Sequence, residues 1–137
     1  MSQEIECPVF GFYAASRKLI ALYSKELEAL KITYPQHLVI TCLLIQDGLS
    51  VDAIGEQLFL DSGTLTPLLK RLEKNGFIIR QVCEADERKK LIFLTKKGKG
   101  CTAKLEALKE KMKSKLGFTQ EERKQFRHIL HKIINTL

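Results

Sequence analysis

Residues 60–76 read Leu-Asp-Ser-Gly-Thr-Leu-Thr-Pro-Leu-Leu-Lys-Arg-Leu-Glu-Lys-Asn-Gly, and this stretch decides the fold of the chain. Asp61 or Ser62 can accept hydrogen bonds from the free N–H groups of a first helical turn, and Asn75-Gly76 suits a left-handed C-cap. Between these ends, leucines recur at the i, i+3, i+4, i+7 spacing that places side chains on one face of a helix. The stretch therefore predicts an amphipathic helix whose core-facing stripe consists of Leu65, Leu68, Leu69 and Leu72.

The opposite face of this helix carries small hydroxyl side chains first and cations last. Such a helix can enter the major groove of DNA, with its N-terminal half near base edges and its cations near phosphates. The alternative is an ordinary amphipathic helix whose polar face is only solvated, but the flanking sequence favours the DNA interpretation. The residues expected to contact DNA from this helix are Ser62, Thr64, Thr66, Pro67, Lys70 and Arg71.

The flanking segments predict the rest of a DNA-binding motif. Residues 49–58 predict a short helix capped by Ser50, and Phe59-Leu60 forms the turn into the next helix. Two helices in this order are a helix-turn-helix. A β-wing is predicted after them, from a strand over 77–81, a charged turn over 84–90 and a second strand over 91–95.

This run of elements resembles the MarR family of winged-helix regulators, and most closely its organic-hydroperoxide-sensing (OhrR-type) branch. The resemblance extends from about Tyr13 to the C-terminus, and the segments that carry it are 32–36, 55–58, 60–71, 86–88 and 94–95. It implies a mainly α fold with a small β-wing and a winged helix-turn-helix. It also implies a sequence-specific transcriptional regulator, expected to be a repressor, that binds double-stranded DNA.

The apolar pattern of the first and last helices predicts a homodimer. The chain of 137 residues is expected to form a single MarR-type domain, with residues 35–95 as the winged helix-turn-helix and residues 1–34 and 96–137 as dimerisation helices. The last helix, opened by a capping box of Thr119 and Glu122, carries a stripe too long for the winged core alone. We interpret this stripe as a dimer interface, which would place two recognition helices on a palindromic operator. The alternative is that the stripe folds back on its own domain. Its members are Phe126, Ile129, Leu130, Ile133, Ile134 and Leu137.

Two further helices are predicted before the motif and one after it. A helix over 9–30 and a buried helix over about 35–46 precede the motif, and a helix capped by Thr95 runs to about Leu116.

Charge and composition support a nucleic-acid partner. The net charge is +7. Residues 61–99 hold ten Lys and Arg against five Asp and Glu, an excess of five that covers most of this net charge. A basic surface concentrated in this way is typical of a polyanion binder.

No apolar run is long enough to cross a bilayer, and the acidic residues 1–6 are unlike a secretion signal, so we expect a cytoplasmic protein without membrane contact. Its four cysteines are then expected to be reduced thiols.

Cys7 is the candidate redox sensor. It precedes Pro8, a favoured first helical residue, so it is expected at an N-cap, where a helix lowers the pKa of a thiol. In the resembled branch the sensing cysteine lies four residues before the tyrosine that matches Tyr13. That position is Val9 here, and on a regular helix a two-residue displacement turns the side chain by about 200°. The match therefore requires an irregular chain around Pro8.

Other residues of the resembled sensor are present. Its hydrogen-bonding tyrosines match Tyr23 and Tyr34. Cys101 could resolve an oxidised Cys7 of either subunit, provided that the two Cα atoms come within about 7 Å. Cys42 is expected in the core, and Cys83 opens the wing.

The tip of the wing is expected to contact DNA. Asp86, Arg88 and Lys90 match family positions that hold an Asp–Arg pair, with the arginine in the minor groove and the aspartate fixing its rotamer. The alternative is a solvated, charged hairpin tip. The wing residues expected at DNA are Asp86, Arg88, Lys89 and Lys90.

Other classes of function have weaker support. His128 and His131 share a helix face but lack further ligands at metal spacing, so no metal and no cofactor are expected. The chain has no P-loop, Gly-x-Gly-x-x-Gly or Ser-His-Asp order, and an enzyme is not expected. Three alternatives remain open. They are a regulator switched by a small ligand between the dimer helices and the wing domain, a thiol enzyme such as a peroxidase, and an RNA-binding winged helix.

Overall fold

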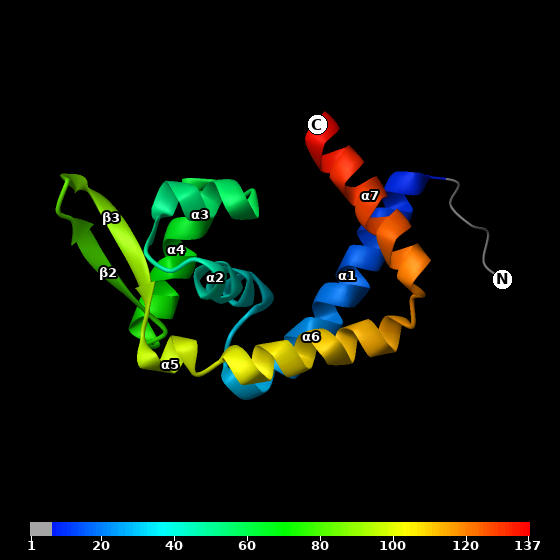
Figure 1. Ribbon diagram of the computed structural model, residues 1–137, viewed down its shortest axis with the longest axis horizontal. Coiled ribbons are helices and arrows are strands. Elements are labelled where there is room, and N and C mark those ends of the chain that lie inside the picture. The colour runs from blue at the N-terminus through cyan, green and yellow to red at the C-terminus, as the bar shows by residue number, and fades with distance from the viewer. Residues whose placement is uncertain (1–6) are drawn as a thin grey trace. The chain divides into compact units, whose positions relative to one another are not determined.

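Helices account for most of the chain in the computed structural model, which describes residues 7–137 (Figure 1). Residues 1–6, the acidic segment that is unlike a secretion signal, lie outside the described residues. Two compact units are formed, one ending at Leu105 and the other covering Glu106–Leu137. Among the described residues, no helix combines the length and the apolar character that crossing a membrane requires. The elements are α1 (Pro8–Leu27), η1 (Glu28–Leu30), α2 (Tyr34–Ile45), β1 (Leu49–Ser50), α3 (Val51–Leu58), α4 (Ser62–Lys74), β2 (Ile78–Cys83), β3 (Asp86–Leu94), α5 (Lys96–Lys99), α6 (Thr102–Leu116) and α7 (Gln120–Thr136).

The predicted helix-turn-helix is confirmed as α3 and α4. The Ser50 hydroxyl accepts from the Ala53 N–H at 3.1 Å, and Asp61, rather than Ser62, caps α4 by accepting from the Thr64 N–H at 2.7 Å. The connection is tight because Phe59 adopts a left-handed conformation (φ 54°). A side chain at Gly55 would also meet the Leu60 carbonyl oxygen at 2.8 Å. These contacts fix the angle at which α4 leaves the turn.

Buried leucines anchor α4 to the rest of the first unit. Leu65, Leu69 and Leu72 are buried as predicted, and Leu68 is half-buried. They share the core with α2, whose Val39, Ile40 and Leu43 are buried. Each fully buried Leu or Ile contributes roughly 1.5–3 kcal/mol through the hydrophobic effect, so this core holds the recognition helix in place.

The helix predicted over 9–30 is interrupted near its end. Its α-helical part stops at Leu27, a 3-10 turn follows, and Lys31 adopts a left-handed conformation (φ 55°). The next helix opens with a capping box between Thr33 and Gln36. Hence the connection between α1 and α2 is short and well defined.

The wing is an antiparallel pair of strands, β2 and β3, with Ile78 opposite Leu94 and Arg80 opposite Ile92. The charged turn predicted over 84–90 is shorter in the structure, because residues 86–90 already belong to β3 and only 84 and 85 form the turn. The sequence did not predict β1, a two-residue strand that joins β3 on its other edge in the order β1-β3-β2. A strand this short has no periodic signal.

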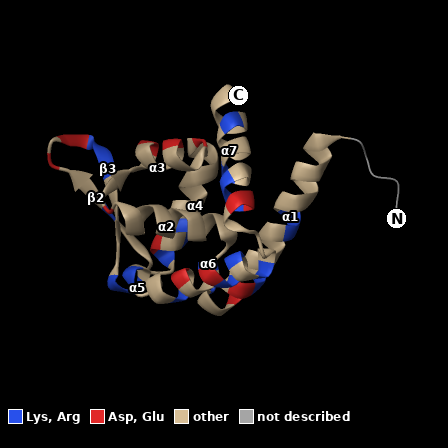
Figure 2. Ribbon diagram, turned by 45° about the vertical axis from the view of Figure 1, so that its right-hand side comes forward, with Lys and Arg blue, Asp and Glu red and all other residues tan. Residues whose placement is uncertain are grey.

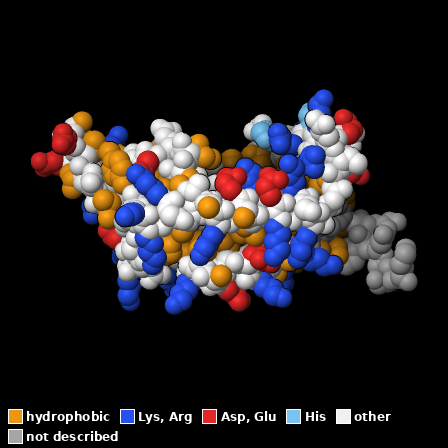
Figure 3. Space-filling model, turned by 60° about the horizontal axis from the view of Figure 1, so that its bottom comes forward, with side chains coloured by type: hydrophobic (Ala, Val, Ile, Leu, Met, Phe, Trp, Pro, Cys, Tyr) orange, Lys and Arg blue, Asp and Glu red, His pale blue; other side chains and the backbone are white. Residues whose placement is uncertain are grey.

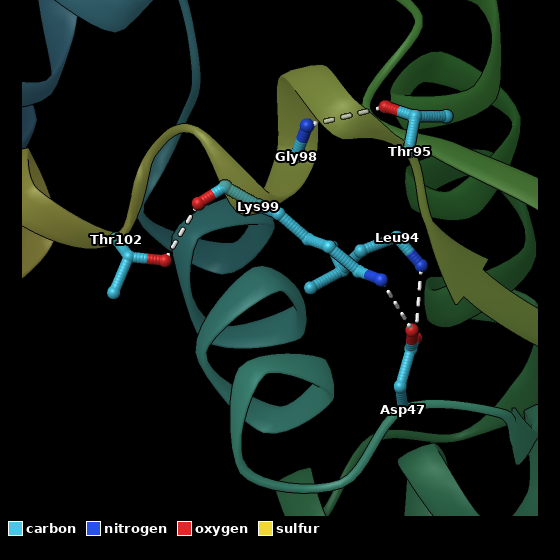
Figure 4. Close-up of polar contacts among 6 residues, drawn as sticks. All are labelled: Asp47, Leu94, Thr95, Gly98, Lys99 and Thr102. Carbon is cyan, nitrogen blue, oxygen red and sulfur yellow. Dashed lines mark hydrogen bonds and ion pairs between the residues drawn. The ribbon is translucent and has the colours of Figure 1, made fainter.

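The helix predicted from Thr95 to about Leu116 is divided into α5 and α6 at Gly100 and Cys101. Thr95 caps α5 by accepting from the Gly98 N–H at 3.1 Å, whereas the Thr102 hydroxyl donates to the Lys99 carbonyl at 2.6 Å (Figure 4). Gly98 is required because a Cβ there would lie 2.3 Å from the Phe77 carbonyl oxygen. α5 therefore packs closely on Phe77, the residue that precedes β2.

Asp47, between α2 and β1, links three elements at this point. One carboxylate oxygen accepts from the Leu94 N–H at 2.9 Å, and the other lies 3.8 Å from the Lys99 ammonium (Figure 4). The end of the wing strand is thereby connected to α2 and to α5. The hydrogen bond is the firmer of the two contacts, because the Lys99 side chain is largely exposed and surface ion pairs contribute little.

The second unit contains most of α6, a turn at Gly117 (φ 62°) and α7. The predicted capping box is present, with the Thr119 hydroxyl accepting from the Glu122 N–H at 3.1 Å and the Glu122 carboxylate accepting from the Thr119 N–H at 2.8 Å. The apolar stripe of α7 is largely exposed, and Ile129 is 52% exposed.

Candidate DNA interface and thiol site

The polar face of α4 presents the predicted DNA-contacting residues to solvent. Thr66 is half-buried, and the side chains of Ser62, Thr64, Pro67, Lys70 and Arg71 are exposed. Pro67 has no N–H to donate to the Gly63 carbonyl, which removes one hydrogen bond of the regular helical pattern. The first turn keeps its geometry because Asp61 caps it, and these same hydrogen bonds hold the pKa of the Asp61 carboxyl below its usual value. The exposed hydroxyl groups therefore project from a fixed helical turn.

The wing tip places opposite charges next to one another. Figure 2 shows acidic residues at the tip and basic residues along the adjoining part of β3. Arg88, Lys89 and Lys90 are exposed, as expected of phosphate-contacting residues. The Asp86 carboxylate accepts from the backbone N–H of Arg88 at 3.0 Å, so it contacts the backbone rather than the guanidinium. The expected Asp–Arg side-chain pair is thus not formed, and the Arg88 guanidinium is free to turn toward a ligand.

Cys7 lies at the N-cap of α1, as predicted, and is exposed. Its backbone is extended (φ −131°, ψ 108°), and its carbonyl accepts from the N–H groups of Phe10 and Gly11. The helix begins only at Pro8, so helical geometry does not set the direction of the Cys7 side chain. Val9, the position that matches the family's sensor, is 75% exposed.

Tyr23 and Tyr34 lie together, and His37 completes an aromatic cluster with them. The ring centroids are 5.3 Å apart for the two tyrosines, 5.6 Å for Tyr23 and His37, and 5.5 Å for Tyr34 and His37. Burial raises the pKa of both phenols and lowers the pKa of the His37 imidazole, so all three groups favour the neutral form. The Nδ1 atom of His37 is buried without a hydrogen-bond partner. Sequence reasoning missed His37, although its i+3 spacing from Tyr34 on α2 placed the two on one face.

The thiol and the tyrosine cluster are well separated within one chain. Cys7 precedes the first turn of α1 and Tyr23 lies near its end, and a helix rises 1.5 Å per residue, which gives a separation of roughly 24 Å. Figure 1 shows α1 as one continuous helix. Cys7 therefore cannot form a hydrogen bond with either tyrosine of its own chain.

The remaining thiols have different surroundings. Cys101 is buried, and its Sγ donates to the Lys97 carbonyl at 3.6 Å. Burial raises the pKa of the Cys101 thiol, against the opposing charges of Lys104 and Lys97. Cys42 is buried, as predicted, and donates to the Gln57 side-chain oxygen at 2.9 Å, whereas Cys83 is half-buried at the end of β2. Cys101 and Cys7 are both free thiols in the single chain.

No group of three or more His, Cys, Asp or Glu side chains in residues 7–137 is arranged to hold a metal ion.

The chain is similar to known transcriptional regulators over most of its length. The MarR family model matches residues 32–90. The HTH-type transcriptional regulator TtmR of Methylorubrum extorquens is 46% identical over 115 residues, which are 84% of this chain and 59% of that protein, so the chain spans less than two thirds of this relative. The organic hydroperoxide resistance transcriptional regulator of Bacillus subtilis is 42% identical over 135 residues, covering 93% of this chain and 87% of the relative.

A solved structure agrees with these relatives. The structure of reduced AbfR bound to DNA superimposes with a TM-score of 0.78 at 33% identity, covering 94% of this chain and 90% of AbfR. The winged helix-turn-helix, the family model and two relatives above 40% identity lead to the same result. The chain belongs to the MarR family of winged-helix transcriptional regulators.

Proposed function

We propose that the protein is a homodimeric regulator that binds a palindromic site in double-stranded DNA, in the cytoplasm, and represses transcription from it. The observation that carries this proposal is the exposed hydroxyl-and-cation face of α4 beside a basic wing. In this arrangement α4 enters the major groove, and Arg88 reaches the adjacent minor groove. The similarity to AbfR, which has been solved bound to DNA, supports the same mode of binding.

A selection experiment tests DNA binding directly. The purified protein is incubated with random duplexes, and the enriched sequences are aligned and remeasured by fluorescence anisotropy at several salt concentrations. We expect an inverted repeat and a steep loss of affinity with salt, because lysine and arginine contacts release counterions from phosphates. A duplex RNA that competes as well as the selected DNA would favour the RNA-binding alternative instead.

The proposed switch is oxidation of Cys7 by an organic hydroperoxide. The thiolate sulfur attacks one peroxide oxygen and the O–O bond breaks. The other oxygen leaves with a proton as an alcohol, so the sulfur is oxidised to a sulfenic acid while the peroxide is reduced. Exposure of Cys7 at the N-terminus of α1 supports this chemistry, since a peroxide in solution can reach its sulfur. The relative from Bacillus subtilis is itself named for organic hydroperoxide resistance.

In this proposal the sensor is built from both subunits. Roughly 24 Å of helix separate Cys7 from the tyrosines of its own chain. A Cys7 sulfur that uses Tyr23 and Tyr34 as hydrogen-bond donors must therefore meet those of the partner chain. Cys101, which is buried, would act as a resolving thiol only after the α5–α6 junction opens.

The switch is tested by treating the DNA complex with cumene hydroperoxide. We expect the wild-type protein to leave the DNA and Cys7→Ser to remain bound, with Cys42→Ser as a control that still responds. Tyr23→Phe and Tyr34→Phe should blunt the response without weakening DNA binding. Peptide mass spectrometry that finds Cys7 unmodified after release would exclude it as the sensor. Catalytic turnover of peroxide with a thiol reductant would point to the enzyme alternative.

A further inference from the structure

A groove of about 680 Å³ lies in the first unit, where α3 meets the start of α4. Its charged side chains are all acidic: Asp52, Glu56 and Asp61 line it, and among residues 7–137 no Lys or Arg does. Figure 2 shows acidic residues along α3, whereas Lys and Arg side chains are spread over the side of the molecule in Figure 3. On a chain with a net charge of +7, this groove is therefore a local exception.

Two of the three carboxylates are available to a ligand. The Asp61 carboxylate caps α4 through the Thr64 N–H, but Asp52 and Glu56 are exposed, and within the described chain neither side chain forms a hydrogen bond or an ion pair. Glu56 lies in the last turn of α3, where the helix dipole disfavours a negative charge. Stabilisation of the helix therefore does not explain this acid. Because Asp52 and Glu56 are four residues apart, they project from the same face of α3.

An exposed aromatic ring forms the apolar part of the groove. Phe59, in the turn between the two helices, is 75% exposed. The other apolar lining residues are half-buried or buried, and they are Val51, Leu60 and Leu65. Aromatic side chains are enriched in protein–protein interfaces, where a polar rim surrounds an apolar centre. The groove has this composition, with Phe59 as the apolar centre and two unpaired carboxylates at its rim.

The position of the groove restricts the charge of its occupant. Ser62, at the start of α4, also lines the groove, and this residue is expected to contact DNA. An occupant beside Ser62 has carboxylates on one side and DNA phosphates on the other. A positively charged occupant is attracted by both, whereas the carboxylates repel the DNA itself. This step rests on the proposed DNA binding.

We propose that this groove docks a basic segment of a second DNA-binding protein. Lys or Arg side chains of the segment pair with Asp52 and Glu56, and an apolar side chain packs on Phe59. Proteins that bind DNA carry such basic segments, because Lys and Arg neutralise the phosphates. The contact joins the regulator to a protein on the adjacent stretch of DNA, so that each raises the effective concentration of the other.

Docking is tested without DNA, by fluorescence anisotropy of a labelled peptide, Lys-Arg-Leu-Lys-Lys-Phe-Arg-Lys, with the full-length protein at low salt. Two analogues are compared: one has Ser in place of Leu and Phe, and the other has Gln in place of every Lys and Arg. We expect the first peptide to bind and both analogues to bind several-fold more weakly, because each lacks one of the two contacts. No binding of the first peptide, or an analogue that binds as tightly, overturns the proposal.

Matched charge variants locate the binding site. Asp52→Asn combined with Glu56→Gln should weaken peptide binding several-fold. Glu84→Gln combined with Glu87→Gln removes the same charge from exposed positions at the wing and should leave peptide binding intact. The proposal does not survive if the Asp52/Glu56 variant binds like the wild type, or if the wing variant loses as much affinity.

Phe59→Asn tests the apolar contact without straining the fold. Phe59 adopts a left-handed conformation (φ 54°), which asparagine tolerates better than phenylalanine, so the variant should keep at least the wild-type melting temperature. It should bind the peptide several-fold more weakly, whereas Ile45→Asn, at another exposed apolar residue, should bind normally. Unchanged peptide binding by Phe59→Asn contradicts a contact at this ring.

Other occupants give distinct results. A second copy of the chain would produce, in sedimentation, an assembly larger than a dimer that the Asp52/Glu56 variant loses, and a small organic cation would show as benzylamine displacing the peptide. Either result overturns the proposal. Because the peptide measurements contain no DNA, lost peptide binding contradicts this inference alone, and failure to select a DNA site contradicts the proposed function.

Discussion

His37 shows how burial changes the chemistry of a single residue. Its imidazole packs against Tyr23 and Tyr34, and its Nδ1 is buried without a partner. Burial lowers the pKa of His37 below its usual value of 6.5. The unfolded chain therefore binds a proton at a higher pH than the folded chain does. The associated stability is fully present above about pH 6.5 and is lost as the pH falls toward the folded-state pKa.

We therefore expect His37→Phe to flatten the pH dependence of stability between pH 7.5 and 5.5. The wild type should lose stability over this range because protonation favours its unfolded state, and the variant should lose less. Urea denaturation at both pH values measures the difference, and His128→Gln serves as the control with an exposed histidine. Equal losses in the wild type and His37→Phe would show that His37 does not contribute to this linkage.

At the level of elements, the helix caps could be predicted and the tertiary contacts could not. Three helices are capped by a side chain that accepts a hydrogen bond from the backbone N–H three residues ahead, a local pattern that can be recognised in the sequence. The capping residues are Ser50, Asp61 and Thr119. The break at Gly100 and the close approach of Gly98 to Phe77 were not predicted; Phe77 is twenty-one residues away in the sequence, so this contact leaves no local pattern. The strand β1 was missed because two residues show no periodic pattern, and the contact of His37 with Tyr23 was missed because it joins α2 to α1.

The packing of α5 can be tested with neighbouring glycines. Gly98→Ala should destabilise the protein by about 1–3 kcal/mol, because the new methyl group collides with the Phe77 carbonyl. Gly100→Ala is the matched control. Its nearest contacts are at 3.3 Å, so it should have a much smaller effect. Thermal and urea denaturation of both variants measure this, and similar free energies of unfolding would contradict the close approach of α5 to Phe77.

The wing is tested at Arg88. Replacing it by alanine should weaken operator binding by about 1–3 kcal/mol if the guanidinium enters the minor groove. Anisotropy titrations on the selected duplex measure the loss, and Arg127→Ala, on α7, is the control for the change in net charge. An Arg88→Ala protein with wild-type affinity would remove the wing from the proposed mode of binding.

At the level of the whole molecule, the apolar stripe of α7 bears on assembly. Phe126, Ile129, Ile133 and Ile134 are all exposed in the single chain, which is unfavourable unless another surface covers them. We expect Ile129→Asp combined with Ile133→Asp to give a monomer with lost operator affinity, because unpaired charges are costly to bury. Sedimentation is the measurement, with His128→Asp and Lys132→Asp as exposed control substitutions on the same helix. A dimer that survives the double isoleucine substitution would exclude this face as the interface.

The length of α1 has a genetic consequence for the proposed sensor. If each oxidation site takes its thiol from one chain and its tyrosines from the other, defects in the two parts should complement each other. A cell that expresses Cys7→Ser together with a Tyr23→Phe, Tyr34→Phe chain would form some mixed dimers. In each mixed dimer, one site would combine the intact Cys7 with the intact tyrosines, and the second site would lack both. Two alleles that are separately unresponsive to peroxide would then restore a partial response when they are expressed together.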